Sequence, residues 1–267
     1  MSTMVDPSVS PPTQIDGGRR PTTGSGRRHF FTWRDLVIPL VVAIAVGAEV
    51  YYLNTAKLSQ IVESQMTFDR ISDSTIEHVK LAFAVTALVL VASIPVGIAV
   101  TRVRLLEPFA LLIANAGQAV PSIGLVAIVA LVWEIGFWPV VISLTLFAVL
   151  PVLRNTIVGL DQIDPDIKDA ARGMGMSPAG VLFRVELPLA VPVIAAGART
   201  ALVLAVATIP IGYFIGAGGL GDQLMQGIKL SRNQQMFAAA LFVACLALIL
   251  DWLGGIVERV LTPAGIR

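Results

Sequence analysis

The sequence predicts an all-α membrane protein with about six transmembrane helices and a helical loop on the cytoplasmic side. Three observations support this fold class. Hydrophobic residues make up 55% of the chain and charged residues only 14%, and the mean hydropathy is +0.80, which is unlike a soluble domain. Apolar runs of about the 20 residues that a helix needs to cross a bilayer recur along the chain. Lysine and arginine concentrate in alternate connections, as expected when those connections stay in the cytoplasm.

The N-terminal segment, residues 1–35, is predicted to be a disordered cytoplasmic tail. It is rich in Pro, Gly, Ser, Thr and Arg and has too little apolar surface to fold alone. The first apolar run begins only after Trp33-Arg34-Asp35, whereas a secretory signal peptide would place its apolar core near the start. We therefore expect this run to remain as a membrane anchor.

Six apolar stretches approach the length of a membrane span. Their approximate bounds are 36–53, 81–100, 109–132, 135–153, 189–215 and 236–261. Only Trp133-Glu134 separates the third stretch from the fourth, which is compatible with a tight turn or with a re-entrant element. The region from 36 to 74 then contains the first span and an outer loop.

The distribution of positive charge gives the orientation. If the N-terminus lies inside, the outer connections hold only Lys57, Arg70, Lys80, Lys229 and Arg232, and all other Lys and Arg except Arg199 fall on the inner side. Both termini and the polar segment from 164 to 188 are therefore predicted to be cytoplasmic.

This polar segment is predicted to form two short helices. Asp164-Pro165-Asp166 and Ser177-Pro178 each combine a capping side chain with a proline suited to the first helical turn. Gly175 can end the first helix or adopt a left-handed turn, and Leu187-Pro188 is expected to redirect the chain into the fifth span. Ala170 and Ala171 are expected to form a small face for close packing. The result is a helix-turn-helix that protrudes into water.

The segment also resembles a known motif. Asp169-Ala170-Ala171, then Gly175, then Val185-Glu186-Leu187-Pro188 resembles the EAA coupling motif of bacterial ABC importer permeases, with Asp169 in place of the usual Glu and Val185 in place of the usual Ile. The flanking residues resemble the glycine betaine/carnitine/choline branch. The alternative for such a loop is an amphipathic segment that only lies on the membrane. The resemblance implies an ATPase-coupling role for the following residues: Asp169, Ala170, Ala171, Gly175, Val185, Leu187 and Pro188.

The resemblance implies further expectations about the whole chain. The fold would be MetI-like (ABC transmembrane type 1), with a permease domain at 75–261 and a cytoplasmic tail at 262–267. The partners would be an ABC ATPase dimer, a second permease chain, identical or a sister subunit, and an extracytoplasmic solute-binding protein, in the bacterial cytoplasmic membrane. This chain contains no GxxxxGK[ST] phosphate loop, so the resemblance implies that the ATPase subunit binds and hydrolyses ATP and that this chain binds no cofactor.

Two other functions remain open at this point. A methionine-type or other small amino-acid importer would share the coupling motif and a similar glycine run, although Arg172–Met176 and Gly197–Thr200 favour the betaine branch. A channel or scaffold that works without ATP belongs to a different class. Co-purification with an ATPase would separate these classes.

The glycine run 216–222 fits the GxGxxG dinucleotide fingerprint only superficially. That fingerprint requires a preceding β-strand, whereas this run follows a membrane span. We expect a tight turn and a short surface helix near 222–230, and the resemblance implies that the turn shapes the outer mouth where the binding protein docks. The mouth residues would be Gly216, Gly218, Gly219 and Gly221.

Two segments are predicted to border the transport path. Gln118, Pro121 and Ser122 lie in the third span, where proline is expected to kink the helix. Broken helices often border the path in transporters, although proline kinks are common in any membrane helix. Thr208, Pro210 and Tyr213 in the fifth span form the second set.

Arg199 and Asp251 fall at a comparable depth in the fifth and sixth spans. Charges inside a membrane are costly unless they are paired, so we expect a structural ion pair between them. A proton relay is the alternative. Glu49, near the outer end of the first span, is expected to reach water.

Other classes of function lack the residues that they need. The two histidines, His29 and His78, are assigned to a tail and an outer loop, without companions at metal-ligand spacing, so no metal site is expected. The single Cys245 is expected to be a buried core residue. The net charge of +1 gives no basic surface for nucleic acid, and no catalytic triad or carboxylate pair for a membrane protease is visible.

Overall fold

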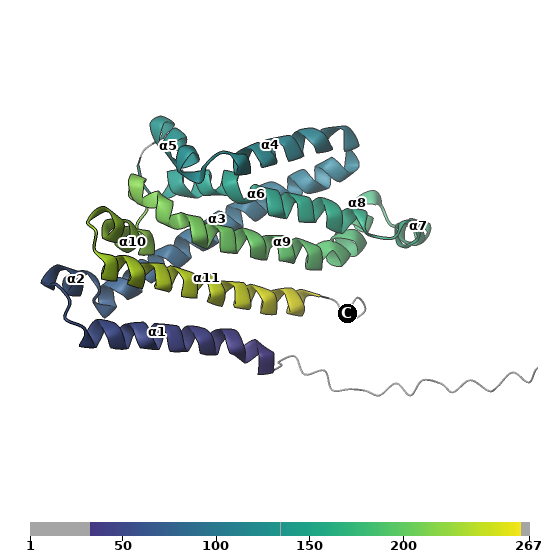
Figure 1. Ribbon diagram of the computed structural model, residues 1–267. Coiled ribbons are helices and arrows are strands. Elements are labelled where there is room, and N and C mark those ends of the chain that lie inside the picture. The colour runs from purple at the N-terminus through teal and green to yellow at the C-terminus, as the bar shows by residue number, and fades with distance from the viewer. Residues whose placement is uncertain (1–32, 134, 263–267) are drawn as a thin grey trace, which may run out of the picture. The chain divides into compact units, whose positions relative to one another are not determined.

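The computed structural model describes residues 33–133 and 135–262, so the predicted tails at 1–32 and 263–267 and the residue Glu134 lie outside the described residues. The described part is helical almost throughout (Figure 1). In chain order, the elements are η1 (Trp33–Leu36), α1 (Val37–Thr55), α2 (Gln60–Gln65), α3 (Phe68–Arg102), η2 (Arg104–Leu106), α4 (Glu107–Ala119), α5 (Ser122–Val132), α6 (Phe137–Asp161), α7 (Pro165–Gly173), α8 (Pro178–Val181), the π-helical η3 (Leu182–Glu186), α9 (Leu187–Thr208), the 3₁₀-helical η4 (Ile209–Ile215), α10 (Leu220–Lys229) and α11 (Asn233–Leu261).

The predicted spans are largely confirmed, with one change of type. Among the described residues, five helical segments are long and apolar enough to cross a membrane, and the pair α4 and α5 makes a sixth only if it counts as one span. These two helices meet at an angle of 98° around Val120-Pro121. The expected kink at Pro121 is therefore wrong: the helix breaks completely, because proline disfavours helical geometry in the residue before it.

Other prolines inside the spans do not break their helices. Pro95, Pro151 and Pro192 all lie within continuous helices. A proline inside a membrane helix is tolerated when neighbouring helices stabilise the backbone that it leaves unpaired. The sequence alone does not separate Pro121 from these three.

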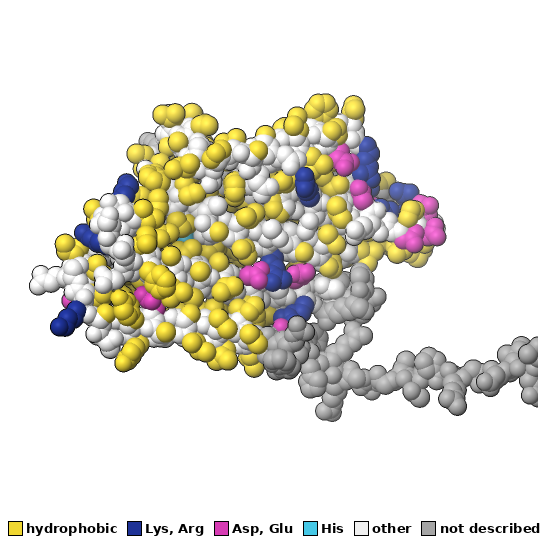
Figure 2. All heavy atoms as spheres, viewed as in Figure 1, with side chains coloured by type: hydrophobic (Ala, Val, Ile, Leu, Met, Phe, Trp, Pro, Cys, Tyr) yellow, Lys and Arg dark blue, Asp and Glu magenta, His cyan; other side chains and the backbone are white. Residues whose placement is uncertain are grey.

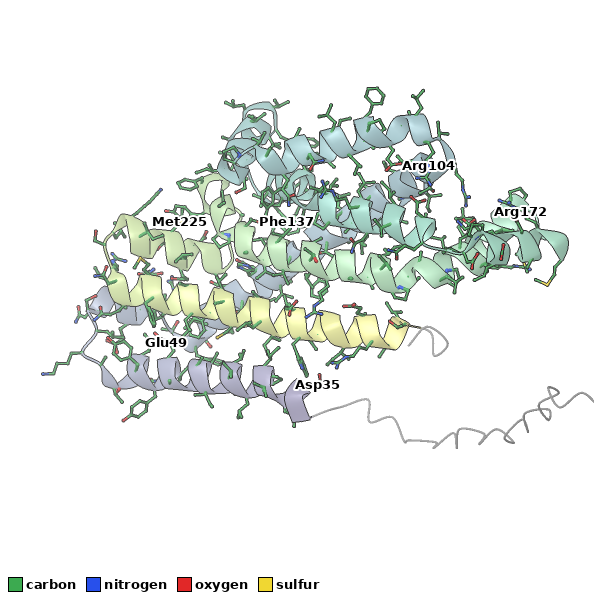
Figure 3. The ribbon with its side chains drawn as sticks, turned by 45° about the vertical axis from the view of Figure 1, so that its right-hand side comes forward. Asp35, Glu49, Arg104, Phe137, Arg172 and Met225 are labelled. Atoms are coloured by element: carbon green, nitrogen blue, oxygen red, sulfur yellow. The ribbon has the colours of Figure 1, made fainter. Side chains whose placement is uncertain are left out.

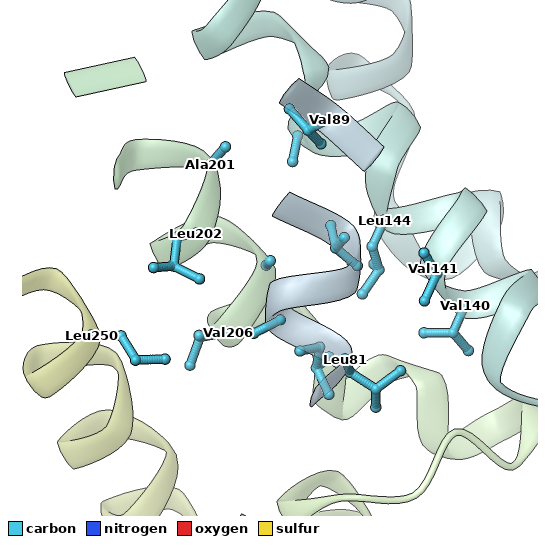
Figure 4. Packing of buried hydrophobic residues seen from close by; sticks show 14 of the residues in the cluster. Leu81, Val89, Val140, Val141, Leu144, Ala201, Leu202, Val206 and Leu250 are labelled. Atoms are coloured by element: carbon cyan, nitrogen blue, oxygen red, sulfur yellow. The ribbon is translucent and has the colours of Figure 1, made fainter. Parts of the chain in front are cut away.

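The helices α3, α6 and α9 form the centre of the bundle, α11 packs on α9, and α1 packs on α11 (Figure 1). Figure 4 shows the aliphatic side chains that fill the centre, among them Val89, Leu144 and Ala201, which are all fully buried. Hydrophobic side chains also cover most of the visible outer face, as expected for spans in lipid (Figure 2).

Three predictions about the first 80 residues need correction. The tail was expected to extend to residue 35, but Trp33–Leu36 form a helical turn, where the Asp35 carboxylate accepts from Arg259 Nη1 at 2.7 Å. The region after the first span is not a simple loop, because it contains α2 and the first turns of α3. Glu49 was expected to reach water, but it is only 5% exposed.

Candidate functional site

The polar segment after α6 forms the expected pair of short helices, α7 and α8, at one end of the bundle (Figure 1). The caps are those that the sequence indicated. Asp164 Oδ1 accepts a hydrogen bond from the backbone N–H of Asp166 at 2.9 Å, and Ser177 Oγ accepts from Gly180 N–H at 3.2 Å. Each cap satisfies a backbone group that the first turn leaves unpaired.

Gly175 makes the turn between α7 and α8. Its φ is +83°, and a Cβ built at this position would meet nothing within 4 Å. Glycine is therefore favoured here by the backbone conformation and not by lack of space. The chain reverses through this residue while the surrounding surface stays open.

The surface of this hairpin carries apolar side chains outside the spans. Ile167 and Met174 are exposed, Met174 to 72%, and the exposed Phe183 follows in the helical segment that continues into the fifth span. Asp169 is also exposed and pairs with Arg172 at 2.9 Å on the same helix. Ala170 and Ala171 do not form one shared face, contrary to expectation. Ala170 is exposed, whereas Ala171 points inward and is buried.

The chain does not change direction at Leu187-Pro188, contrary to expectation. From Pro178 to Ile215 it forms one helical segment of 38 residues. Within it, residues 182–186 form a π-helical turn, where the N–H of Leu187 reaches back five residues to the carbonyl of Leu182. The hairpin is thus joined to the fifth span without a break, and π-turns of this kind are frequent at functional positions.

A buried carboxylate that the sequence analysis did not single out lies in this turn. Glu186 is only 2% exposed and forms an ion pair with Arg102, the last residue of α3. Close by, Arg104 holds Asp161, the last residue of α6, through two contacts of 2.7 and 2.8 Å. The first pair links the π-helical turn to the end of α3, and the second links η2, which follows α3, to the end of α6. Figure 3 shows Arg104 at the same end of the molecule as Arg172 on α7.

The opposite end of the fifth span contains the predicted glycine turn. Gly216, Gly218 and Gly219 all have positive φ, between +69° and +79°. Gly221 has ordinary geometry, but a Cβ there would lie 2.6 Å from Pro210 Cα, so the close approach of α10 to η4 requires glycine. The expected surface helix, α10, is partly buried, because Leu220 and Gln223 face inward.

His78 joins this end of the fifth span to α3. It was assigned to an outer loop, but it is fully buried within α3, with Nε2 3.0 Å from the carbonyl oxygen of Val206. A helical carbonyl normally accepts from the residue four positions later, which here is Pro210 and has no N–H. Since a carbonyl only accepts, His78 Nε2 donates and replaces the missing partner.

Asp222 lies in the first turn of α10, beside the same end of α3. Burial, together with the negative charge of Glu77, raises the pKa of the Asp222 carboxyl above its ordinary value. Glu77 itself accepts a hydrogen bond from the backbone N–H of Gly219 at 2.9 Å. The Glu77 carboxylate therefore stabilises the glycine turn by a hydrogen bond, and the Asp222 carboxyl lies next to it in the chain.

The two segments predicted to border the path come together. The helix α5, which begins with Ser122, packs against η4, which includes Tyr213. Pro210 is buried, with its backbone close to Gly221 of α10, and the hydroxyl of Thr208 donates to the carbonyl of Leu204 at 2.7 Å. Pro121 is exposed and Gln118 half-buried, next to the break between α4 and α5.

Comparison with known proteins gives the family. Residues 93–262, which include both ends of the fifth span, match the family described as binding-protein-dependent transport system inner membrane component. The chain belongs to this family. It is therefore a multi-pass inner membrane permease, a transport component of a binding-protein-dependent ABC system, and not a catalytic subunit.

Characterised relatives of the permease have similar lengths. The glycine betaine/carnitine/choline transport system permease protein OpuCD of Bacillus subtilis is 39% identical over 174 residues, which cover 65% of this chain and 76% of that protein. The osmoprotectant import permease protein OsmW of Salmonella typhimurium is 37% identical over 198 residues, covering 72% and 92%. The choline transport system permease protein OpuBB of B. subtilis is 34% identical over 193 residues, covering 72% and 89%.

A solved structure agrees with the predicted MetI-like fold. The MetNI methionine ABC transporter in an inward-facing conformation matches with a TM-score of 0.65 over 77% of the permease and the whole of that chain, at 22% identity. At this identity the match concerns the fold alone. It covers an arrangement of membrane helices that the apolar runs predicted.

The ion pair between the fifth and sixth spans of the permease has a third member. Arg199 contacts Asp251 through two nitrogens, each 2.7 Å from a carboxylate oxygen, and Glu258 Oε2 lies 3.4 Å from Arg199 Nη1. The arginine side chain lies across Gly254 and Gly255, which leave room for it. A largely apolar cavity of about 360 Å³ between α3, α9 and α11 borders Arg199.

Proposed function

We propose that this permease is the membrane-spanning subunit of an ATP-driven importer for compatible solutes that carry a quaternary ammonium group, such as glycine betaine, choline or carnitine. The support is the set of relatives at 34% to 39% identity, whose names specify these solutes or osmoprotectants in general. The proposal includes a second permease chain, an ABC ATPase dimer that binds the ATP, and an extracytoplasmic solute-binding protein. Both termini face the cytoplasm in this arrangement, as the distribution of Lys and Arg favours.

The hairpin of α7 and α8 is the proposed contact with the ATPase. The observation that carries this assignment is the exposure of Ile167 and Met174 on a segment outside the spans, because large apolar side chains in water mark a surface for a partner. Asp169 and Ala170 lie exposed on the same helix. Gly175 would set the turn, and Val185, Leu187 and Pro188 would carry movement of the hairpin into α9.

The other end of the same helical segment would form part of the outer mouth. We assign this role to the turn with Gly216, Gly218 and Gly219 and to the close contact of Gly221 with η4. Gln118, Ser122 and Tyr213 are the proposed path-lining residues, because the segments that contain them adjoin each other. Pro210 and Pro121 shape these segments.

The substrate class is tested by uptake into proteoliposomes. The permease is reconstituted with a cognate ABC ATPase and solute-binding protein, and ATP-dependent uptake of radiolabelled glycine betaine, choline and methionine is compared. Uptake of a quaternary amine with no uptake of methionine is the expected result. Methionine uptake alone would establish the alternative importer class, and uptake without ATP would establish a channel.

The coupling surface is tested by cross-linking in the same preparation. Met174→Cys is expected to form a cross-link to the ATPase subunit, and Leu131→Cys on α5, where the native side chain is even more exposed than that of Met174, serves as the control. A cross-link from position 131 alone would remove the assignment of the hairpin.

A further inference from the structure

Two aromatic side chains at the outer end of the fifth span surround a positive charge. The rings of Tyr213 and Phe214 meet edge to face, with centroids 5.7 Å apart and an interplanar angle of 74°. The ammonium nitrogen of Lys229 lies 4.6 Å from the Tyr213 centroid and 5.1 Å from the Phe214 centroid. Both distances are within the range of about 6 Å for a cation–π interaction.

The backbone holds this group of three in place. Tyr213 and Phe214 belong to η4, which ends at Gly216 in a left-handed conformation, and Ala217 N–H returns to the carbonyl of Gly212 at 3.1 Å. Lys229 is the last residue of α10, which packs on η4. The rings are therefore fixed by the turn that closes the span, whereas the long lysine side chain is the mobile member.

The site remains accessible on one side. Phe214 is 45% exposed, and Tyr213 is half-buried beside it. No carboxylate of the described residues is paired with Lys229 in an ion pair, so the rings are its principal partners there. Such a position is open to exchange with another cation.

We propose that Tyr213 and Phe214 form a binding site for the quaternary ammonium group of the substrate, and that Lys229 occupies this site when no substrate is present. The inference rests on the proposed function, since only a cationic substrate requires it. A quaternary ammonium group has no N–H to donate, so water binds it weakly and ring faces suit it well. The lysine ammonium donates three hydrogen bonds and returns to water at little cost.

Lys229 is then a tethered competitor for the substrate. Its removal leaves the ring pair free and lowers the substrate concentration needed to fill the site. Until the substrate displaces it, the Lys229 ammonium group keeps a positive charge over the two rings. The outer mouth thereby distinguishes cations that bind aromatic rings from those that remain hydrated.

Equilibrium binding of radiolabelled tetramethylammonium tests the inference directly. The permease is purified with its ATPase in nanodiscs, without the binding protein, so that only sites in this complex are measured. Phe214 is replaced by phenylalanine carrying one, two or three fluorine atoms, which weaken the cation–π attraction stepwise with little change of shape. Lys229→Met removes the competitor, and Tyr213→Leu removes one ring.

The expected result is a graded loss of affinity with each fluorine, about tenfold loss in Tyr213→Leu, and a gain of severalfold in Lys229→Met. Phe137 provides the matched control, because it forms a similar edge-to-face pair with Trp138 at 5.4 Å and 88°, and fluorination there is expected to have no effect. Figure 3 shows Phe137 toward the same end of the molecule as Met225 on α10.

Two outcomes would overturn the inference. Affinity that does not depend on fluorination at position 214 would show that the rings do not bind the cation. Unchanged affinity in Lys229→Met would show that the lysine has only a structural role. The proposed function fails separately, if the wild-type system takes up neither glycine betaine nor choline, because the binding measurement does not require transport.

Discussion

The 38-residue helical segment from Pro178 to Ile215 contains a proline near each end, and the helix geometry around the two prolines differs. At the hairpin end, which is the inner end in the proposed orientation, the helix passes Pro188 without a break, because the π-turn before it shifts the hydrogen-bond pattern. At the outer end, the helix tightens into η4 at Pro210, and His78 supplies the hydrogen bond that the proline cannot. Proline is therefore compatible with a continuous helix at one end. At the other end it coincides with a tighter 3₁₀ helix, which a hydrogen bond from His78 of α3 stabilises.

The two ends of the segment also differ in the kind of polar contact that stabilises them. The inner end depends on ion pairs between side chains, such as Glu186 with Arg102, and on an exposed hairpin. At the outer end, the Glu77 carboxylate accepts a hydrogen bond from the Gly219 N–H and His78 donates one to the Val206 carbonyl, and the turn depends on positive-φ glycines. We infer that the inner end transmits movement as a unit, whereas the outer end holds a shape.

The largest expected effect concerns the inner hairpin. Gly175→Val places a β-branched residue at φ +83° and is expected to reduce ATP-dependent uptake at least about tenfold, because the strain of roughly 2 kcal/mol or more reorients α7. Gly175→Asn, which tolerates this conformation, is expected to retain most of the uptake. Gly173→Ala is the control, because Gly173 is equally open but has ordinary geometry. Loss of uptake in all three variants would contradict the role of the turn.

Removal of the buried carboxylate at the inner end should affect stability. Glu186→Ala leaves Arg102 without its partner and is expected to lower the free energy of unfolding by about 2 kcal/mol, less than for a fully buried pair because Arg102 is 44% exposed. The measurement is unfolding in nanodiscs of both single variants and of the double variant with Arg102→Met. A double variant that loses the sum of both effects would show that the residues do not interact.

Substitution of His78 should lower the stability of the outer end. His78→Phe keeps the volume but leaves the Val206 carbonyl unpaired, at an expected cost of about 1 to 2 kcal/mol and with faster hydrogen exchange in residues 209–216. His78→Gln can still donate and is expected to restore part of the loss. In the Pro210→Ala background, which returns an N–H to this position, the substitution at 78 should cost less. An equal cost in both backgrounds would contradict the explanation.

The smallest expected effect is a pH dependence at the outer end. Because the pKa of Asp222 is raised in the folded state, that state favours the protonated carboxyl and loses stability as pH rises from the ordinary pKa through the raised one. Asp222→Asn removes this loss and is expected to be more stable than wild type at neutral pH, by less than about 1 kcal/mol given the partial exposure. The difference should vanish at acidic pH. A difference that is constant across pH would point to packing instead of charge.

The inner end is the part that the sequence predicts best. Apolar runs fix the spans, and the caps at Asp164 and Ser177 depend on residues close in sequence, so local patterns suffice. Ala171 points inward and Ala170 outward because consecutive residues of a helix lie about 100° apart around its axis, so the two alanines could not share one face. Arg199 and Asp251 were matched by depth alone, and Glu258 was missed because it lies two turns further along α11.

The outer end depends on contacts between residues far apart in sequence. His78 pairs with a carbonyl 128 residues away, and no side-chain pattern marks that acceptor. Pro210 was the available signal, because every proline in a helix leaves one carbonyl in need of a donor. The break at Pro121 was also not predictable, since Pro95 and Pro151 occur in similar apolar runs without a break. Lys229 lies 15 or 16 positions from the rings that it covers, and only the turn brings them together.

The unbroken segment from Pro178 to Ile215 has a mechanical consequence. At about 1.5 Å per residue, 38 residues make a rod of nearly 60 Å, longer than the hydrocarbon layer of about 30 Å. A tilt of about 5° around its inner end would displace its far end by roughly 5 Å, comparable with the size of a trimethylammonium group. If the hairpin receives the movement as proposed, a small rotation at that end of the segment would therefore shift the other end by a molecular dimension.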